Sequence, residues 1–383
     1  MMKKLFFAFV ILAASCTACQ PMSPVTTPEL TAEPLPTHTL FPSMTAPTAT
    51  ATPTEPAPAT ASMEIEEITF QSGHFTLVGD LQIPATEEKH PAIIMVHGDG
   101  GIDRYGFGTY RPVMERFLRA GYAVFSWDKP GTGASRGKLA NDGAKLSQRA
   151  AILVSAAELL KEHPAIDHER IGAWGISQGG YVIPLALRMT DDIAFMIVVS
   201  GPAMDSYDQG AYLLGQMAFC AGASQEEARF IEQHLSAADK AITYQDYYEN
   251  TVLLQEHPKF QAMGLSLNIL SESEWKPEDR GGLAFFDPIE VIERTTIPVL
   301  AFFGEKDRQV DPFQGAQAYQ EALQKAGNRN YRVELIPGVD HNIVLCETGC
   351  LAERDKRSRA DWLKYAPEYL DWMEEWLVQL ADF

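Results

Sequence analysis

Short, almost continuous apolar runs are the feature that most constrains the fold of this chain. Each run is four to six residues long, the length of a strand rather than a helix. Strands that are apolar at every position are typical of a parallel sheet buried on both faces. Stretches with helical periodicity, such as residues 146–160, separate the runs. This alternation predicts an α/β fold with a doubly wound, mostly parallel sheet. The runs span residues 92–96, 123–127 (with one serine, Ser126), 171–176, 195–199, 299–303 and 333–336 (with one charged residue, Glu334), preceded by a predicted strand pair at 65–70 and 75–82.

The N-terminus has the pattern of an export signal. A short basic start is followed by ten apolar residues, 5–14, too few to cross a bilayer as a helix. Small residues then lead to Cys16, and this arrangement resembles the lipobox of bacterial lipoproteins, although Ala13 stands where leucine is more usual. We expect residues 1–15 to be a lipoprotein signal peptide and Cys16 to carry the lipid. Cys19 is a second candidate, and an ordinary secretory signal is the alternative.

Residues 16–62 are expected to form a disordered spacer. The segment 20–62 holds ten prolines and eleven threonines and has too little apolar surface to offset the entropy of ordering. We therefore place the globular domain at residues 63–383. The whole chain has 383 residues and a net charge of −20 at pH 7. Binding nucleic acid needs clustered Lys and Arg, so we expect no nucleic-acid partner. We expect the protein to reside in the bacterial cell envelope, attached to the membrane through its lipid.

The motif Gly-Ile-Ser-Gln-Gly at residues 175–179 points to nucleophilic chemistry. It follows the apolar run 171–176 and precedes a predicted helix at residues 178–189. A serine at such a strand-to-helix turn is lifted above the sheet, and the tight turn requires flanking glycines. Ser177 is therefore the candidate nucleophile; a purely structural tight turn is the alternative.

Two further motifs each follow an apolar run. His97-Gly98-Asp99-Gly100-Gly101 follows the run 92–96, and Asp128-Lys129-Pro130-Gly131-Thr132-Gly133-Ala134-Ser135 follows the run 123–127. With the serine motif in the same order, the chain from about residue 65 resembles the α/β-hydrolases, in particular the bacterial serine esterase and S33-peptidase-like branch. This resemblance implies an eight-stranded sheet, a helical cap insertion at about residues 203–287, and a Ser-Asp-His triad.

The base and the acid of the triad follow from chain order, since in this fold the acid and then the histidine come after the nucleophile. His341 stands in the loop after the last apolar run and is the expected base; His234 and His257 lie in a polar, helix-like segment. Asp307, which fits the family's Gly-x-x-Asp loop, is the expected acid. The competing carboxylates are those of Glu305, Asp311 and Asp340.

The oxyanion hole is expected to consist of two backbone N–H groups. Gln178, the residue after the nucleophile, supplies one of them. The loop after His97 supplies the second, with Asp99 as first choice and Gly100 as the alternative. Because an acidic side chain beside an anion is unfavourable, the Asp99 carboxylate must point away.

The expected globular domain contains three cysteines. Cys346 and Cys350 are expected either to pair with each other or to remain two thiols, and Cys220 is expected to be a buried thiol. The sequence contains no His-Glu-x-x-His motif and no phosphate-binding loop, so we expect neither a metal nor a cofactor.

Met204, Tyr207, Tyr212, Met217 and Phe219 of the insertion are candidates either for an acyl pocket or for packing the cap.

The predicted function is that of a serine carboxylesterase acting on a small-molecule acyl ester through an acyl-enzyme. A peptidase, an amidase or an acyltransferase on the same fold is the alternative. A non-catalytic, surface-tethered binding protein is the alternative from another class. Acyl and alcohol specificity and the oligomeric state stay open at this point.

Overall fold

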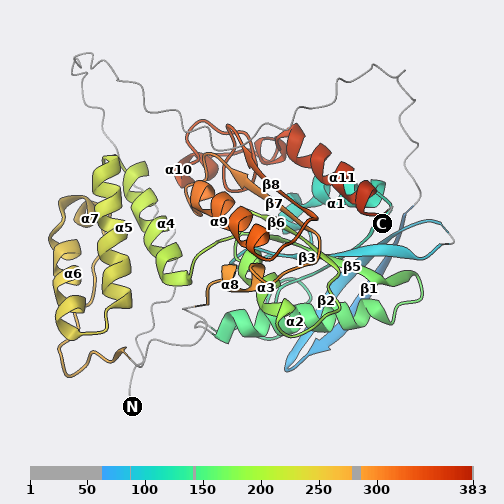
Figure 1. Ribbon diagram of the computed structural model, residues 1–383, viewed down its shortest axis with the longest axis horizontal. Coiled ribbons are helices and arrows are strands. Elements are labelled where there is room, and N and C mark those ends of the chain that lie inside the picture. Colours follow the sequence, from blue (N-terminus) through green and yellow to red (C-terminus); the bar gives the residue numbers. More distant parts are fainter. Residues whose placement is uncertain (1–62, 87, 141–143, 278–285, 382–383) are drawn as a thin grey trace. The chain divides into compact units, whose positions relative to one another are not determined.

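The computed structural model describes residues 63–381 apart from 87, 141–143 and 278–285. The predicted signal peptide and spacer therefore lie outside the described residues. Within the described part, eight strands form one sheet in the order β1-β2-β4-β3-β5-β6-β7-β8 (Figure 1). β2 is antiparallel to both of its neighbours, and all other pairs are parallel. The strands are β1 (Met63–Ser72), β2 (Phe75–Pro84), β3 (His90–Val96), β4 (Ala123–Trp127), β5 (Ile166–Ile176), β6 (Phe195–Val199), β7 (Val299–Gly304) and β8 (Tyr331–Ile336).

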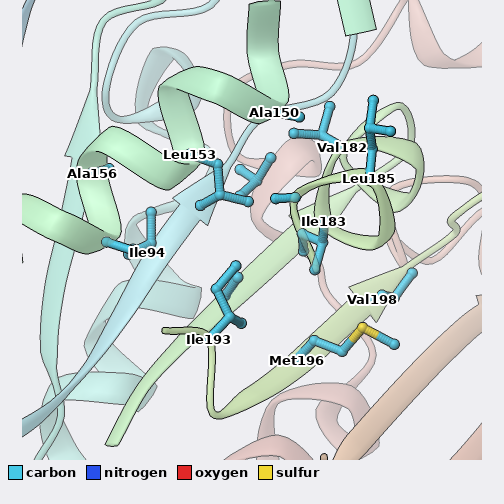
Figure 2. Packing of buried hydrophobic residues seen from close by; sticks show 14 of the residues in the cluster. Ile94, Ala150, Leu153, Ala156, Val182, Ile183, Leu185, Ile193, Met196 and Val198 are labelled. Atoms are coloured by element: carbon cyan, nitrogen blue, oxygen red, sulfur yellow. The ribbon is translucent and has the colours of Figure 1, made fainter. Parts of the chain in front are cut away.

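Helices cover both faces of the sheet, which explains the apolar runs of its central strands; β8, the last strand of the sheet, is only partly buried and contains Glu334. In β3, Ile94 and Val96 join one buried cluster, while Ile93 and Met95 join the cluster on the opposite face. The first face packs against α2 (Ala144–Lys161), α3 (Gly179–Leu187), α8 (Ile289–Ile292) and α9 (Pro312–Lys325). Figure 2 shows α2 and α3 side chains meeting those of β3 and β6. The second face packs against α1 (Arg111–Arg119) and α11 (Pro367–Ala381). The predicted doubly wound α/β sheet is confirmed.

An aromatic stripe at helical spacing over residues 361–377 predicts a last helix that packs into the core, but the helix begins later than this pattern indicates. The periodicity indicates one helix from about residue 361, whereas the structure has a single 3₁₀ turn, Asp361–Leu363, and then α11 from Pro367. Proline disfavours helical conformation in the residue before it and is well suited to the first turn of a helix. The predicted core role of the aromatic stripe holds for Tyr369 and Trp376, which are buried.

In the sequence, a group of helices lies between β6 and β7, and we call this group the cap. It comprises α4 (Ser206–Cys220), α5 (Gln225–Lys240), α6 (Tyr244–Glu256) and α7 (Pro258–Ala262). The cap has a small apolar core of its own, which includes Ile231, Leu254 and Phe260. The other short helices are η1 (Gly106–Gly108) and α10 (Leu351–Arg354). No helix among the described residues is both long and apolar enough to span a membrane.

The disulfide pairing corrects both expectations for the cysteines. Cys220 at the end of α4 is bonded to Cys350, and Cys346 is the free thiol in the described part of the chain. The two Cα atoms are 5.8 Å apart although 130 positions separate them in sequence, a distance typical of disulfides. Folding of the cap brings them together, which local spacing cannot reveal. The bond links the cap to the segment that follows His341.

Candidate active site

The sequence-predicted residues lie at one edge of the sheet. Ser177 follows β5, Asp307 lies three residues after β7, His341 comes five residues after β8, and Asp99 follows β3. Parallel strands end at the same edge, so these loops are neighbours. Chain order along the sheet reverses at β3, which lies between β4 and β5. Such a switch point is where open α/β sheets bind their ligands.

Ser177 has a strained backbone conformation at a tight turn. Its φ is +55°, a left-handed conformation that is uncommon outside glycine. The turn is fixed by two hydrogen bonds, from the Ser177 N–H to the Val199 carbonyl (2.9 Å) and from the Gly180 N–H to the Ser177 carbonyl (2.8 Å). A Cβ atom at Gly179 would lie 2.6 Å from the Val96 carbonyl oxygen. That close approach explains the glycine two residues after the serine.

His341 and Asp307 form a buried pair. His341 Nδ1 lies 2.7 Å from Asp307 Oδ2, and the two residues are 5% and 1% exposed. The other carboxylate oxygen of Asp307 accepts the backbone N–H groups of Gln309 (2.7 Å) and Val310 (3.0 Å). When Nδ1 donates to a carboxylate, Nε2 is left as a proton acceptor. No hydrogen bond joins Ser177 to His341 in the described part of the chain.

The competing carboxylates have other partners. Asp311 caps the N-terminus of α9 by accepting the N–H groups of Phe313 and Gln314. Glu305 accepts the N–H of Gly338 at 3.0 Å. Asp340 is ion-paired with Arg357 at 2.6 Å. The structure therefore brings only Asp307, among the four candidates, to the His341 ring as a hydrogen-bond partner within the described residues.

The two alternative histidines belong to the cap. His234 Nδ1 lies 2.7 Å from the side-chain oxygen of Asn250, which is on α6. His257 stacks on Phe230 with ring centroids 4.8 Å apart. Both residues take part in the packing of α5 against the following helices.

The loop after β3 passes directly beside Ser177. A Cβ atom at Gly98 would lie 3.3 Å from Ser177 Cβ. Neither the Asp99 N–H nor the Gln178 N–H donates to another described group. The Asp99 side chain is ion-paired with Lys145. Although desolvation opposes it, the hydrogen bond and charge of Lys145 lower the pKa of Asp99 below its usual value. The carboxylate is thus neutralised by a group on α2.

Two buried cations, Lys129 and Arg149, were missed in the sequence reasoning. Lys129 Nζ donates to the Gly98 carbonyl at 2.7 Å. The Arg149 guanidinium donates to the His97 carbonyl and, at 2.5 Å, to the Gln178 side-chain oxygen. The residues are 3% and 6% exposed. One signal was available: a charged residue at position 149 directly precedes Ala150 on the apolar face of the predicted helix.

Burial and mutual repulsion lower the pKa values of Lys129, Arg149 and the neighbouring His97. Burial, followed by the charge of Arg149, holds the pKa of Lys129 well below its usual value. Burial lowers the pKa of Arg149 to about 10. Burial and the charges of both cations hold the pKa of His97 well below its usual value, so its ring is neutral at pH 7. The neutral ring of His97 lies 3.4 Å from Ser126 Oγ, measured from Nε2.

A network of ion pairs fixes the turn that carries Lys129. Asp128 Oδ2 accepts from the Ala134 N–H and from the Arg104 guanidinium, each at 2.9 Å. Arg104 also pairs with Asp80 at 2.5 Å and with Glu67 at 3.1 Å. This explains the aspartate and the small residues of the second motif, because the chain must fold back onto its own carboxylate.

Helix α4 of the cap contacts the loop that carries Asp307. The Tyr212 hydroxyl donates to the Asp307 carbonyl at 3.2 Å, and the Gln209 amide donates to the Gln309 carbonyl at 2.5 Å. Tyr212 is buried, so of the residues considered for an acyl pocket, this one packs the cap onto the site. The described residues contain no group of His, Cys, Asp and Glu side chains arranged to hold a metal ion.

Comparison with known proteins assigns the family. The family described as "Serine aminopeptidase, S33" (Hydrolase_4) matches residues 87–348, more than half of the chain. The chain belongs to this family. The match covers the loop after β3, the Ser177 turn, Asp307 and His341, and it supports the predicted α/β-hydrolase superfamily.

Individual relatives match over shorter segments. An uncharacterized 31.7 kDa protein of Escherichia coli is 31% identical over 102 residues, which are 26% of this chain and 33% of that protein. The quorum-quenching protein AidA of Acinetobacter baumannii is 30% identical over 144 residues, 37% of this chain and 45% of that protein. The chain thus matches less than half the length of these curated relatives. Among solved structures, the Pyrococcus furiosus esterase Pf2001 is similar in fold, with a TM-score of 0.51, 16% identity, and coverage of 83% of this chain and 91% of that one.

Proposed function

We propose that the protein is a serine hydrolase that cleaves carboxylic esters. The observation that carries the proposal is the buried His341–Asp307 pair, with 2.7 Å between Nδ1 and Oδ2, at the same sheet edge as a serine held at φ +55°. A serine hydroxyl is a weak nucleophile without a base, and a base needs a group that fixes its tautomer. Ser177, His341 and Asp307 fill these roles in the proposed reaction.

The proposed reaction has two steps. Ser177 Oγ attacks the acyl carbonyl while His341 Nε2 takes its proton, a contact that forms when substrate occupies the site. The tetrahedral oxyanion accepts hydrogen bonds from the backbone N–H groups of Gln178 and Asp99. The imidazolium then protonates the departing alcohol. Water, activated by the same histidine, releases the acid from the acyl-enzyme. Asp307 stabilises the imidazolium in both steps.

Peptide or amide cleavage is the second candidate, favoured by the description of the family as serine aminopeptidases. The same acyl-enzyme would form, with an amine as the leaving group. Transfer of the acyl group to an acceptor other than water is a variant of the same chemistry. A non-catalytic binding protein would need neither the strained serine nor the buried histidine–aspartate pair.

Reporter substrates distinguish these activities. The full-length chain is assayed with p-nitrophenyl acetate, butyrate and octanoate, and in parallel with aminoacyl p-nitroanilides. Ester turnover that disappears in Ser177→Ala, with slower or no anilide turnover, supports the esterase. Faster anilide turnover supports the peptidase. Ester turnover that persists in Ser177→Ala contradicts the proposal, and so does the absence of Ser177-dependent turnover of either reporter class.

We also propose that the protein is exported and lipid-anchored through Cys16, with residues 16–62 as the spacer and residues 63–383 as the catalytic domain. The support is the pattern of residues 5–16, ten apolar positions and small residues before a cysteine. The test is mass spectrometry of the mature N-terminal peptide from membrane fractions, with Cys16→Ser as the control. A diacylated cysteine lost in the control supports the anchor, and an unmodified mature N-terminus contradicts it.

A further inference from the structure

We propose that Lys129 and Arg149 are positioning residues that hold and polarise the oxyanion hole, an inference that rests on the proposed function. Both cations donate to main-chain carbonyls of the loop after β3. Neither makes an ion pair with a carboxylate in the described part of the chain. Burying a cation without such a partner is costly, so a functional reason is required.

The contact of Lys129 falls on the peptide unit that matters most. Its ammonium donates to the Gly98 carbonyl at 2.7 Å. That carbonyl belongs to the same peptide unit as the Asp99 N–H, the proposed second oxyanion donor. A positive charge on the oxygen of an amide withdraws electron density from its N–H, and hydrogen bonds in series strengthen one another. Lys129 thus makes the Asp99 N–H a stronger donor.

Arg149 joins the two halves of the hole. One part of its guanidinium donates to the His97 carbonyl in the loop after β3, and another donates to the side-chain oxygen of Gln178 at 2.5 Å. Gln178 supplies the other proposed oxyanion N–H. A single planar side chain therefore links the two segments that carry the donors, which lie about 80 residues apart in sequence.

Helix α2 supplies Arg149 together with the group that neutralises Asp99. Lys145 and Arg149 are four residues apart and lie on the same side of the helix. Lys145 pairs with the Asp99 carboxylate, so that charge does not oppose a developing oxyanion. The nearby Asp128 is engaged by Arg104. The balance of Lys129, Lys145, Arg149 and Asp99 leaves an excess of positive charge beside the hole.

The test separates activity from stability. Lys129→Met keeps the length of the side chain and removes its charge. The substrate is p-nitrophenyl butyrate, and the inhibitor is an alkyl trifluoromethyl ketone, which forms a tetrahedral oxyanion with serine. We expect kcat to fall by about tenfold or more and the Ki of the ketone to rise by about the same factor. KM should change by less than about threefold. The melting temperature should not fall, because the variant no longer buries an unpaired cation.

Three comparisons complete the test. Arg149→Lys keeps a cation but cannot bridge both halves, and it should lose activity as well. Lys129→Arg keeps the charge and should retain more activity than Lys129→Met. Arg116→Met, which removes an arginine paired with Glu374 on α11, should leave kcat unchanged. If Lys129→Met fails to fold, the comparison of Lys129→Arg and Arg149→Lys with wild type decides the matter.

The outcomes are distinguishable. Wild-type turnover with a kcat and ketone Ki in Lys129→Met within about twofold of wild type overturns this inference and leaves the esterase intact. A loss of activity matched by an equal loss of stability also overturns it, because it indicates a structural role. If the wild-type chain neither hydrolyses the ester nor binds the ketone, the proposed function fails and the inference fails with it.

Discussion

Replacing Asp307 by asparagine should remove most of the activity while leaving the fold intact. The structure determines which way the new amide would point. Oδ1 of Asp307 accepts two backbone N–H groups, from Gln309 at 2.7 Å and Val310 at 3.0 Å. The asparagine oxygen must stay there, since the opposite orientation would leave two buried N–H groups without acceptors at about 1–3 kcal/mol each. The amide NH₂ therefore faces His341.

That orientation imposes the wrong tautomer on the histidine. His341 Nδ1 becomes a hydrogen-bond acceptor, Nε2 carries the proton, and the ring cannot take a proton from Ser177. The loss in kcat for this kind of change is about 10⁴-fold, equivalent to about 5 kcal/mol of transition-state stabilisation. Hydrolysis of p-nitrophenyl butyrate measures it, and circular dichroism checks the fold.

Asp311→Asn provides a matched control. Asp311 lies four residues away and caps α9, a role that asparagine fills equally well. Its kcat should therefore stay close to that of the wild type. The reasoning is refuted if Asp307→Asn keeps kcat within about tenfold of wild type, or if Asp311→Asn loses as much activity as Asp307→Asn.

Three further predictions concern stability. The Cys220–Cys350 bond closes a loop with a sequence separation of 130, so the double alanine variant should lose up to about 5 kcal/mol in free energy of unfolding by urea titration; unchanged stability would contradict the pairing. Stability should fall as pH decreases below 6.5, the usual pKa of histidine, because buried His97 stays neutral in the folded chain and takes up a proton on unfolding; His97→Asn should flatten that slope, and an equal slope would count against it. Gly133→Ala places a methyl group against the Asp128 carboxylate at φ +52° and should lower the melting temperature, whereas an unchanged melting temperature would show that the turn is not strained.

Sequence reasoning succeeded where information is local. The sequence around Ser177 predicts a strand before it and a helix after it. The structure contains both, β5 and α3. The family resemblance, together with the apolar runs before them, points to His341 and Asp307, and the structure places their side chains in hydrogen-bond contact. The apolar runs themselves reflect burial on both faces of the sheet, which leaves a clear pattern in a single strand.

Contacts between residues far apart in the sequence could not be predicted in the same way. Cys350 pairs with Cys220, far away in sequence, because the cap folds against the segment after His341. Arg149 reads as one charged residue in an apolar helical pattern, and its contacts with His97 and Gln178 come from the packing of α2 against the sheet edge. Neither partner is encoded in the spacing of neighbouring residues.

The most direct test of the proposed chemistry is labelling of the full-length chain with a fluorophosphonate, followed by digestion and mass spectrometry. This reagent reports an activated serine without requiring a guess at the substrate. We predict a single modified site at Ser177, no modification in Ser177→Ala, and strongly slowed labelling in His341→Ala. A folded chain that is not labelled, or that is labelled equally at other serines, would contradict the account.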